Sequence, residues 1–463
     1  MVRKHVNIIK NGKMFSRRKF LKLLAGTGAL CTLPTLMPAS SLGRDGILAP
    51  SDRITIAMFG CGSRARGSII HMDPLPDHQI VAVVDCRKER ALAVQEIVNN
   101  MYARRTGYEH YKGCEETWDF LELLDRPDID VLWGVVNDHW HGPIYRRMIQ
   151  SGKDVYGEKP LTRYVHQGLK VCKLVRQHGT IFQVGTQQRS SSHFRYACEL
   201  ARNGYLGKIT RVEVGVPGGT ICPVAEPCDV PDGFNWDRWS GPAPLLPFDR
   251  NRIEWLALYM ISHYCAGFIT NWGTHHLDIA GWGVPEFFEK PFTVEGTGVM
   301  PNAGMSDTWL SWHAFLRYDS GLVLDFSNTG APNEQGTRFV GDEGWVLVNR
   351  NGIWASKEPL LDVNFKETDV RLHVSPGSTQ PPRKGHEVDA YTRHTADFFR
   401  AVRTRQDPVA PVEQGHAATS LGNLADIACR TGLKLRWDWE THLFDNDEAN
   451  KMLAPPEREP WTM

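Results

Sequence analysis

A glycine turn between two apolar runs constrains most strongly what this chain can fold into. Residues 54–59 form a short apolar run, and Gly60-Cys61-Gly62-Ser63-Arg64-Ala65 follows at once. A second apolar run, residues 80–84, ends in Asp85. This order of strand, glycine turn, helix, strand and acid predicts a doubly wound α/β domain.

The glycine turn also predicts a dinucleotide site. Gly60 would make the tight turn, Gly62 would let the backbone approach a pyrophosphate, and Ala65 would let the helix pack on the strand. Asp85 stands where a carboxylate binds ribose hydroxyls and favours NAD, whereas Arg87 close by leaves NADP open. The cofactor-binding candidates of this turn are Gly60, Gly62, Ser63, Arg64 and Ala65.

A second feature is the run Val155-Tyr156-Gly157-Glu158-Lys159-Pro160. Proline cannot donate to a strand ladder and biases Lys159 away from helical angles. Glu158 and Lys159 are therefore predicted to lie in a turn at the carboxyl end of a strand, the edge where open α/β sheets bind ligands. An ammonium there could orient a hydroxyl and help to move its proton. The alternative is a surface turn with a solvated ion pair.

Polar residues also end two other predicted strands. Asn137, His139 and His141 follow residues 130–136, and Gln187 follows residues 181–185. The carboxyl ends of parallel strands meet at one edge, so these residues are expected beside the glycine turn. Together with Glu158 and Lys159, these four residues are cofactor-binding candidates. A helix cap and surface histidines are the alternative, most of all for His141.

The periodicity of the chain predicts two domains. Residues 50–185 are expected to form the dinucleotide domain, residues 186–440 a second domain, and residues 441–463 a tail. The second domain alternates in the manner of a large, open, mostly antiparallel sheet with one covered face. Its predicted strands are 209–216, 292–300, 308–318, 322–327 and 337–348, and its predicted helices are 388–402 and 417–430.

The first 42 residues predict export. Ser16-Arg17-Arg18-Lys19-Phe20-Leu21-Lys22 is a twin-arginine pattern, and a moderately apolar run and small residues follow it. The apolar run is short and interrupted by glycine and proline, so it makes a poor membrane span. We therefore expect a periplasmic protein without a stable membrane span, exported already folded. Cys222 and Cys228 share a proline-rich loop and could form a disulfide there.

Composition excludes some classes of partner. Lys+Arg and Asp+Glu both number 53, so no basic excess favours nucleic acid. No spacing of cysteine and histidine resembles a zinc site, and no metal is expected.

Together these motifs resemble the glucose–fructose oxidoreductase / inositol dehydrogenase / rhizopine catabolism (Gfo/Idh/MocA) family over nearly all of the chain after residue 50. The loop from Val230 to Pro242 and the tail from Lys434 to Trp461 resemble an exported bacterial branch. The resemblance rests on Gly60-Cys61-Gly62, Asp85, Asp138-His139-Trp140-His141, Glu158-Lys159-Pro160 and Asn271-Trp272-Gly273-Thr274-His275-His276-Leu277-Asp278.

The resemblance implies a Rossmann domain, an α/β domain with an open sheet, and a nicotinamide between them. It also implies a catalytic set of the Glu-Lys-Pro lysine and an Asp-x-x-x-His pair in the second domain. Lys159 and His275 match, but Asn271 stands where the family has aspartate. An amide can hold a substrate hydroxyl but cannot take its proton, so the base would be His275 or Lys159.

The spacing of Asn271 and His275 predicts one helix face turned to one cleft. Asp278, about one turn further on, is expected to orient a histidine. Helix packing is the alternative role for His275 and His276, and a docking loop between subunits is the alternative for Trp236 and Trp239. The substrate candidates are His275, Asn271, Tyr259, His263, Tyr264 and Trp236.

The expected activity is NAD(P)-dependent oxidation of a hydroxyl of a sugar, glycoside or polyol, commonly at C3. No pool of free NAD exists outside the cytoplasm, so the cofactor would stay bound and be regenerated in each cycle. One alternative is a redox-neutral NAD-dependent glycosidase, although exported glycosidases of this family usually lack the lysine that Lys159 supplies. A different class is a non-catalytic NAD-binding scaffold. The open sheet face suggests a homodimer or homotetramer.

Overall fold

The computed structural model describes residues 7–10, 13–16, 50–107, 109–330, 332–377, 389–454 and 457–463. The chain forms two compact units, Met1–Arg53 and Ile54–Met463. In the first unit, β1 (Asn7–Lys10) pairs with β2 (Lys13–Ser16) in antiparallel register. The predicted export signal spans residues 1–42. Apart from β1 and β2 it lies outside the described residues, and so do both arginines of its motif.

The second unit begins with a six-stranded parallel sheet of order β5-β4-β3-β6-β7-β8. The strands are β3 (Ile54–Phe59), β4 (His78–Val84), β5 (Glu115–Thr117), β6 (Val131–Gly134), β7 (Asp154–Gly157) and β8 (Phe182–Val184). The helices between them are α2 (Ser63–Met72), α3 (Lys88–Thr106), α4 (Phe120–Leu124), α5 (Asp138–Gln150) and α6 (Val165–His178). This is the predicted doubly wound domain, and its chain order reverses between β3 and β6.

A nine-stranded sheet follows, of order β15-β14-β13-β9-β12-β11-β10-β16-β17. Its neighbouring strands are antiparallel except β9 and β12, which confirms the predicted mostly antiparallel sheet. The predicted strand 337–348 is in fact two strands, because the backbone of Gly341 and Gly344 closes a turn between them. The bounds are β9 (Ile209–Val216), β10 (Phe292–Val299), β11 (Ser311–Tyr318), β12 (Val323–Asn328), β13 (Gly336–Gly341), β14 (Trp345–Asn349), β15 (Gly352–Ala355), β16 (Leu435–Asp438) and β17 (Leu443–Phe444).

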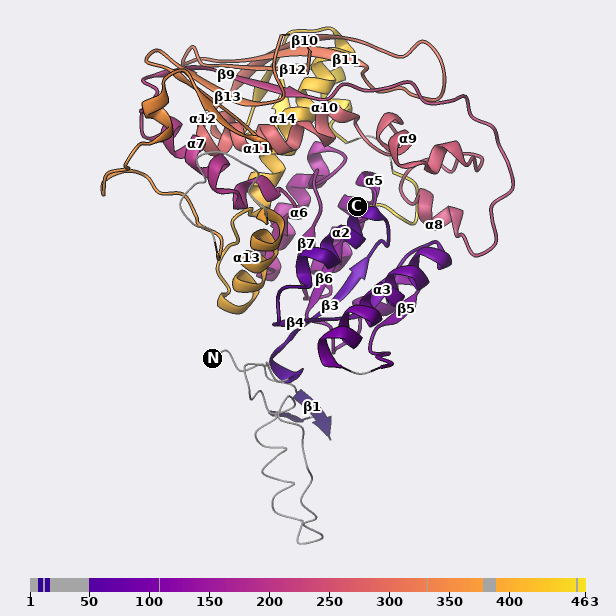
Figure 1. Cartoon of the computed structure of the whole chain (residues 1–463). Coiled ribbons are helices and arrows are strands. Elements are labelled where there is room, and N and C mark those ends of the chain that lie inside the picture. The colour runs from indigo at the N-terminus through magenta and orange to yellow at the C-terminus, as the bar shows by residue number, and fades with distance from the viewer. Residues whose placement is uncertain are drawn as a thin grey trace, which may run out of the picture. The chain divides into compact units, whose positions relative to one another are not determined.

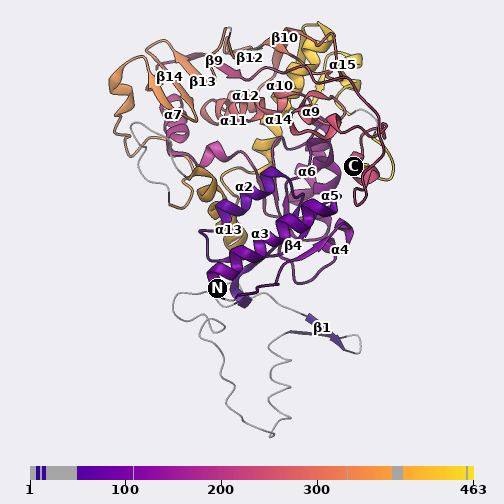
Figure 2. The same ribbon diagram turned by 45° about the vertical axis from the view of Figure 1, so that its right-hand side comes forward.

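A layer of helices lies between the two sheets in both views (Figures 1 and 2). Its main members are α7 (Ser192–Arg202), α10 (Phe268–Asn271), α11 (Gly273–Gly283) and α14 (Val412–Thr431). The α14 helix is buried along almost its whole length and packs on both α6 and β10. It therefore ties the cores of the two sheets together. Shorter helices are α8 (Trp236–Ser240), α9 (Trp255–Met260), α12 (Glu286–Glu289) and α15 (Asp447–Lys451).

A helix from late in the chain completes the core of the first sheet. Phe398 and Phe399 of α13 (Ala390–Thr404) pack edge-on against Trp133 of β6, and Phe398 also contacts Tyr156 of β7. The sequence predicts this helix but not its place, since its apolar face alone does not name a partner. Among the described helices, none is long and apolar enough to cross a membrane. Cys222 is buried, Cys228 is exposed, and both are free thiols.

Candidate active site

The glycine turn has the geometry that a dinucleotide site requires. Gly60 has φ +92°, and a Cβ at this position would stand 2.4 Å from the carbonyl oxygen of Val135. A Cβ at Gly62 would meet only Arg90 Nη1, at 3.9 Å. Packing within the protein therefore demands glycine at position 60 but leaves open space beside position 62. That space is where a pyrophosphate approaches the backbone in this fold, so the residues present fit a dinucleotide.

The two glycines are expected to respond differently to alanine. Gly60→Ala places a side chain in left-handed backbone against a carbonyl, and we expect it to lose at least about 1–2 kcal/mol of unfolding free energy. Gly62→Ala should leave stability within about 0.5 kcal/mol while weakening nucleotide binding. Urea unfolding and the nucleotide released per protein chain measure the two effects. Equal loss of stability in both variants would contradict this reading of the turn.

Other residues of the turn lie beside the glycines. Ser63 begins α2, and Ala65 is fully buried against the sheet, as the helix packing requires. At the end of β4, Asp85 accepts hydrogen bonds from the backbone N–H groups of Cys61 and Arg87, both at 2.8 Å. Burial raises the pKa of Asp85, and these two bonds oppose that rise. The carboxylate is thus held rigidly at the wall of a pocket.

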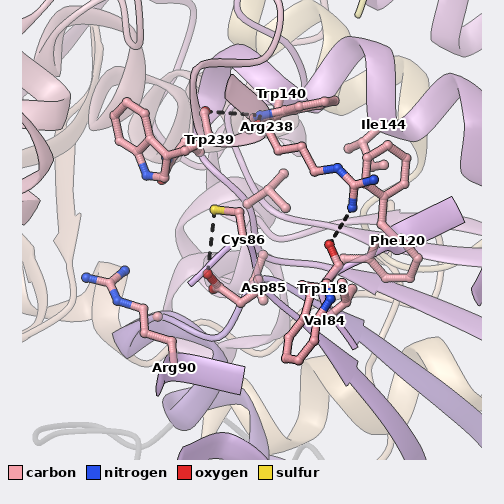
Figure 3. A pocket seen from close by; sticks show the side chains of 16 residues that line it. Val84, Asp85, Cys86, Arg90, Trp118, Phe120, Trp140, Ile144, Arg238 and Trp239 are labelled. Carbon is pink, nitrogen blue, oxygen red and sulfur yellow. Dashed lines mark hydrogen bonds between the residues drawn. The ribbon is translucent and has the colours of Figure 1, made fainter. Parts of the chain in front are cut away.

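This pocket opens at the carboxyl edge of the parallel sheet, and Figure 3 shows Asp85, Trp140 and Trp239 around it. Gly60, Gly62 and Asn137 also line it, so the structure brings four of the predicted cofactor residues to one cavity. Its wall is rich in aromatic side chains. The other lining residues are Phe59, Val84, Cys86, Arg90, Trp118, Phe120, Val135, Val136, Ile144 and Arg238.

Residues 230–244, here called the strap, come from the second domain and close over this pocket. The strap is fastened to the ends of β4 and α3, where Asn235 N donates to Cys86 O and Lys88 N donates to Gly233 O, both at 2.9 Å. Two of its side chains, those of Arg238 and Trp239, line the pocket. The sequence predicts a loop here and offers Trp236 as a substrate candidate, but it does not indicate that the loop covers the pocket beside Asp85.

Ion pairs and aromatic contacts hold the strap from both sides. Arg238 Nη2 lies 2.9 Å from Asp119 Oδ2, and Trp140 Nε1 donates to Arg238 O at 2.9 Å. Trp236 is buried and stacks on Trp239, with ring centroids 4.7 Å apart. The indole nitrogen of Trp236 donates to Leu246 O at 2.8 Å, so Trp236 supports the strap and Trp239 faces the pocket.

The C-terminal tail holds the strap in place. Arg458 Nε donates to the carbonyls of Gly241 and Ala243, at 3.0 and 3.1 Å, and its Nη1 lies 2.7 Å from Asp237 Oδ1. Close by, Trp461 packs on Trp140 with ring centroids 5.3 Å apart. The tail therefore passes beside α8, while its marked end lies by α5 (Figure 1), and the tail acts as a latch on the strap.

The predicted catalytic residues meet at the same edge of the sheet. Lys159 Nζ donates to Asn271 twice, to the backbone oxygen at 3.1 Å and to Oδ1 at 2.8 Å. Asn271 Nδ2 donates in turn to Asp138 Oδ2 at 2.9 Å. Burial lowers the pKa of Lys159, and the negative charges of Asp138 and Glu158 oppose that shift. The lysine thus joins the two domains through Asn271.

The helix that carries Asn271 and His275 differs from the prediction. The expected single helix is two helices, α10 ending at Asn271 and α11 beginning at Gly273. The cause lies in the carbonyls: Asn271 O accepts from Lys159, and Thr270 O accepts from the Thr274 hydroxyl at 2.7 Å. His275 N bonds to Trp272 O instead, at 3.1 Å, so the regular α-helical ladder is interrupted.

His275 is buried and neutral. Burial lowers its pKa well below the usual range, and the nearby charges of Lys159 and Arg350 lower it further. Its Nδ1 has no hydrogen-bond partner among the described residues. A neutral imidazole with a free ring nitrogen can accept a proton, and Lys159 is near enough to influence it. Residues 159 and 275 are therefore close enough for the charge of Lys159 to act on the imidazole.

Several other predicted site residues form hydrogen bonds with other groups of the protein. Glu158 accepts from Arg64 Nε at 2.6 Å and from Gln187 Nε2 at 3.1 Å, so these three predicted residues form a network between α2 and β7. His141 contacts the backbone carbonyls of Pro160 and Val136 through its two ring nitrogens.

Aromatic and histidine candidates surround the centre of the site. His139 shares a hydrogen bond with Trp239 O at 3.0 Å, and burial lowers its pKa to about 4. Tyr264 is buried between His139 and Trp239, and burial raises its pKa to about 12. Tyr259 is partly buried against Phe268, whereas His263 is exposed.

Two residues of the site have no predicted role. The sequence presents Asp138 only as part of a motif, although a carboxylate directly after Asn137 is the available signal. Arg350 lies in the turn between β14 and β15, over the ring of Trp272 at 5.0 Å, and its charge acts on both Lys159 and His275. Nothing in the sequence separates it from an ordinary hairpin turn.

Comparison with known proteins gives the family. A model described as an oxidoreductase family, NAD-binding Rossmann fold (GFO_IDH_MocA), matches residues 54–186. The model of the same family's C-terminal alpha/beta domain matches residues 382–463. Both matched segments of the chain are similar to the Gfo/Idh/MocA oxidoreductase family. The NAD-binding Rossmann fold of this family is the parallel-sheet domain described above.

Two similar proteins each match a part of the chain. Glycosyl hydrolase family 109 protein 4 of Phocaeicola vulgatus is 26% identical over 187 residues, which are 38% of this chain and 33% of that protein. The scyllo-inositol 2-dehydrogenase (NAD(+)) of Bacillus subtilis is 29% identical over 134 residues, 29% of this chain and 35% of that enzyme. The chain thus spans about a third of the length of these two relatives.

Solved structures extend the likeness to the whole fold. The WlbA dehydrogenase of Bordetella pertussis, crystallised with NADH and UDP-GlcNAcA, superposes with a TM-score of 0.58 and 16% identity. The match covers 82% of this chain and 98% of that one. At this identity the match shows that the chain shares the fold of that dehydrogenase over both of its domains.

Proposed function

We propose that this protein is an NAD-dependent oxidoreductase acting on a hydroxyl of a sugar, glycoside or polyol. The observation that carries the proposal is the hydrogen bond of 2.8 Å from Lys159 Nζ to Asn271 Oδ1. This bond supports the proposal because it brings the ammonium to the residue four positions before His275, and the charge of Lys159 acts on that imidazole. Similarity to the scyllo-inositol dehydrogenase supports the class of substrate.

The side chains divide the work of moving one proton. Gly60, Gly62 and Asp85 would hold NAD, which would supply the hydride acceptor. His275 takes the proton of the substrate hydroxyl, because its imidazole is neutral and Nδ1 is free of partners in the described chain. The Lys159 ammonium stabilises the oxyanion that develops, and the buried surroundings strengthen that interaction.

We further propose that the cofactor stays bound through each cycle. The strap covers the pocket beside Asp85, and Arg458 fastens the strap with contacts to three of its residues. Such a closure suits a protein exported folded through the twin-arginine route to the periplasm, where free NAD is absent. The hydride would then return to a second sugar or to a C3-oxidised product.

The latch gives a direct prediction about cofactor retention. Arg458→Ala removes contacts to Asp237, Gly241 and Ala243, and we expect nucleotide to leave roughly ten- to a hundredfold faster, because hydrogen bonds to charged groups are among the stronger ones. Dilution into excess labelled NAD measures the exchange rate. Arg436→Ala, which breaks an exposed pair with Asp319 elsewhere on the surface, is the matched control. Equal exchange rates in the two variants would remove the latch from the proposal.

One experiment separates this function from its alternatives. The purified protein is analysed for released nucleotide and is then mixed with a panel of glycosides and polyols while reduced nicotinamide is followed by absorbance. Oxidation gives the absorbance band or a keto product. A glycosidase, the alternative favoured by the glycosyl hydrolase family 109 relatives, releases sugar without a net band. Bound nucleotide with neither outcome would mark a scaffold and refute the proposal.

A further inference from the structure

The Rossmann domain supplies the carboxylate that the second domain lacks. In the catalytic pair of this family, aspartate is expected where this chain has Asn271. Asp138, the first residue of α5, is buried with 7% of its surface exposed. Its Oδ2 accepts a hydrogen bond of 2.9 Å from Asn271 Nδ2. A negative charge is therefore present beside the lysine, but on the opposite domain.

The amide of Asn271 connects that charge to the lysine in one fixed orientation. Its Oδ1 faces the Lys159 ammonium at 2.8 Å, and its Nδ2 faces the Asp138 carboxylate. A flipped amide would put its N–H groups against an ammonium and its oxygen against a carboxylate, with neither contact able to form a hydrogen bond. The two charges thus select the orientation, and the amide transmits the pull of the carboxylate to the ammonium.

We propose that Asp138 is a positioning residue that acts through Asn271 to hold Lys159 charged and aimed at the substrate oxygen. The role of Lys159 in this proposal rests on the proposed function, whereas the contact between Asp138 and Asn271 does not. It also explains how the chain tolerates an amide at position 271: the carboxylate has moved across the hydrogen bond to α5.

Electrostatics around Lys159 agree with this placement. Burial lowers the pKa of Lys159, Asp138 is the largest charge that opposes this shift, and Glu158 follows. Removing the Asp138 charge should therefore lower the pKa of Lys159 further, so the ammonium would be lost at a lower pH. The other charged or titratable groups that act on Lys159 or respond to it are Glu158, Cys265, Arg350 and His275.

Three variants test the relay. Asp138→Asn keeps the shape and removes the charge, and we expect kcat to fall roughly ten- to a hundredfold with KM little changed. In the pH profile of kcat for Asp138→Asn, the basic limb, where activity is lost as pH rises, should move to lower pH. The double variant Asp138→Asn/Asn271→Asp returns a carboxylate to the other side of the hydrogen bond. It should restore kcat and the position of the basic limb on the pH scale. Asp130→Asn, which alters a carboxylate bonded to Thr55 N at the opposite edge of the sheet, is the control.

A second readout does not depend on turnover. Competitive acetylation with acetic anhydride, traced by mass spectrometry against pH, reports the fraction of Lys159 that is deprotonated, because this side chain is partly exposed. The midpoint should fall in Asp138→Asn and return in the double variant, even if no glycoside is oxidised and the proposed function fails. An unchanged midpoint in Asp138→Asn, or a double variant that matches the single one, overturns the proposal while leaving any measured oxidation intact.

Discussion

Lys159→Ala is expected to lower kcat by about 10²–10⁴-fold, the range over which a positioned acid–base group contributes to catalysis. The variant removes the ammonium that bonds Asn271 and leaves His275 without its charged neighbour. Bound nucleotide should remain, because the glycine turn and the strap enclose the cofactor independently of this lysine. Initial rates of reduced-nicotinamide formation and the nucleotide content of the purified variant measure the two properties.

A matched control and the pH dependence sharpen this expectation. Lys170 is exposed on α6, and Lys170→Ala should leave kcat unchanged. Because removing the Lys159 charge removes one influence that lowers the pKa of His275, the imidazole should become more basic in Lys159→Ala. Residual activity would therefore decline at a higher pH on the acidic side, where His275 becomes protonated. Full activity in Lys159→Ala would exclude the proposed mechanism, and loss of nucleotide would show that the lysine serves binding instead.

Local sequence patterns predicted the elements that present the site. The bounds of β3 and β9 agree with the expected runs, since strands have a distinctive pattern of apolar residues. Gly60 could be assigned its turn from sequence because only glycine tolerates that φ beside a neighbouring carbonyl. Lys159 could be placed at a strand end because the following proline restricts its backbone.

Contacts between distant segments could not be predicted in this way. The hydrogen bond from Asn271 to Asp138 joins two domains. The break between α10 and α11 depends on the hydrogen bond that Lys159 donates to the backbone oxygen of Asn271. The latch formed by Arg458 joins the tail to a loop more than 200 residues away in sequence. Each of these follows from packing that single-segment periodicity does not encode, and each bears directly on the chemistry of the site.

Asp278 shows the same limit, and it leads to the largest expected change in stability. The sequence suggested that it orients a histidine. In the structure it forms a bidentate pair with Arg189, with Nε to Oδ2 at 2.7 Å and Nη2 to Oδ1 at 2.8 Å. The exposed fractions of the two side chains are 3% for Arg189 and 0% for Asp278. Burial raises the pKa of Asp278, and the charge of Arg189 opposes that rise.

Asp278→Ala should therefore lower the free energy of unfolding by about 3–5 kcal/mol, because it leaves a guanidinium buried without its counter-charge. Arg189 also bonds Gln414 at 3.1 Å, so the pair connects the end of the parallel sheet with α11 and α14, the helices behind the catalytic residues. Arg176 offers the contrast, since it pairs with Asp407 and Glu413 on the surface, and Arg176→Ala should cost about 1 kcal/mol or less. Urea unfolding compares the variants. If Asp278→Ala lowers the free energy of unfolding no more than Arg176→Ala does, the buried pair does not hold these segments together. In that case the double variant Arg189→Met/Asp278→Leu should be no more stable than Asp278→Ala alone.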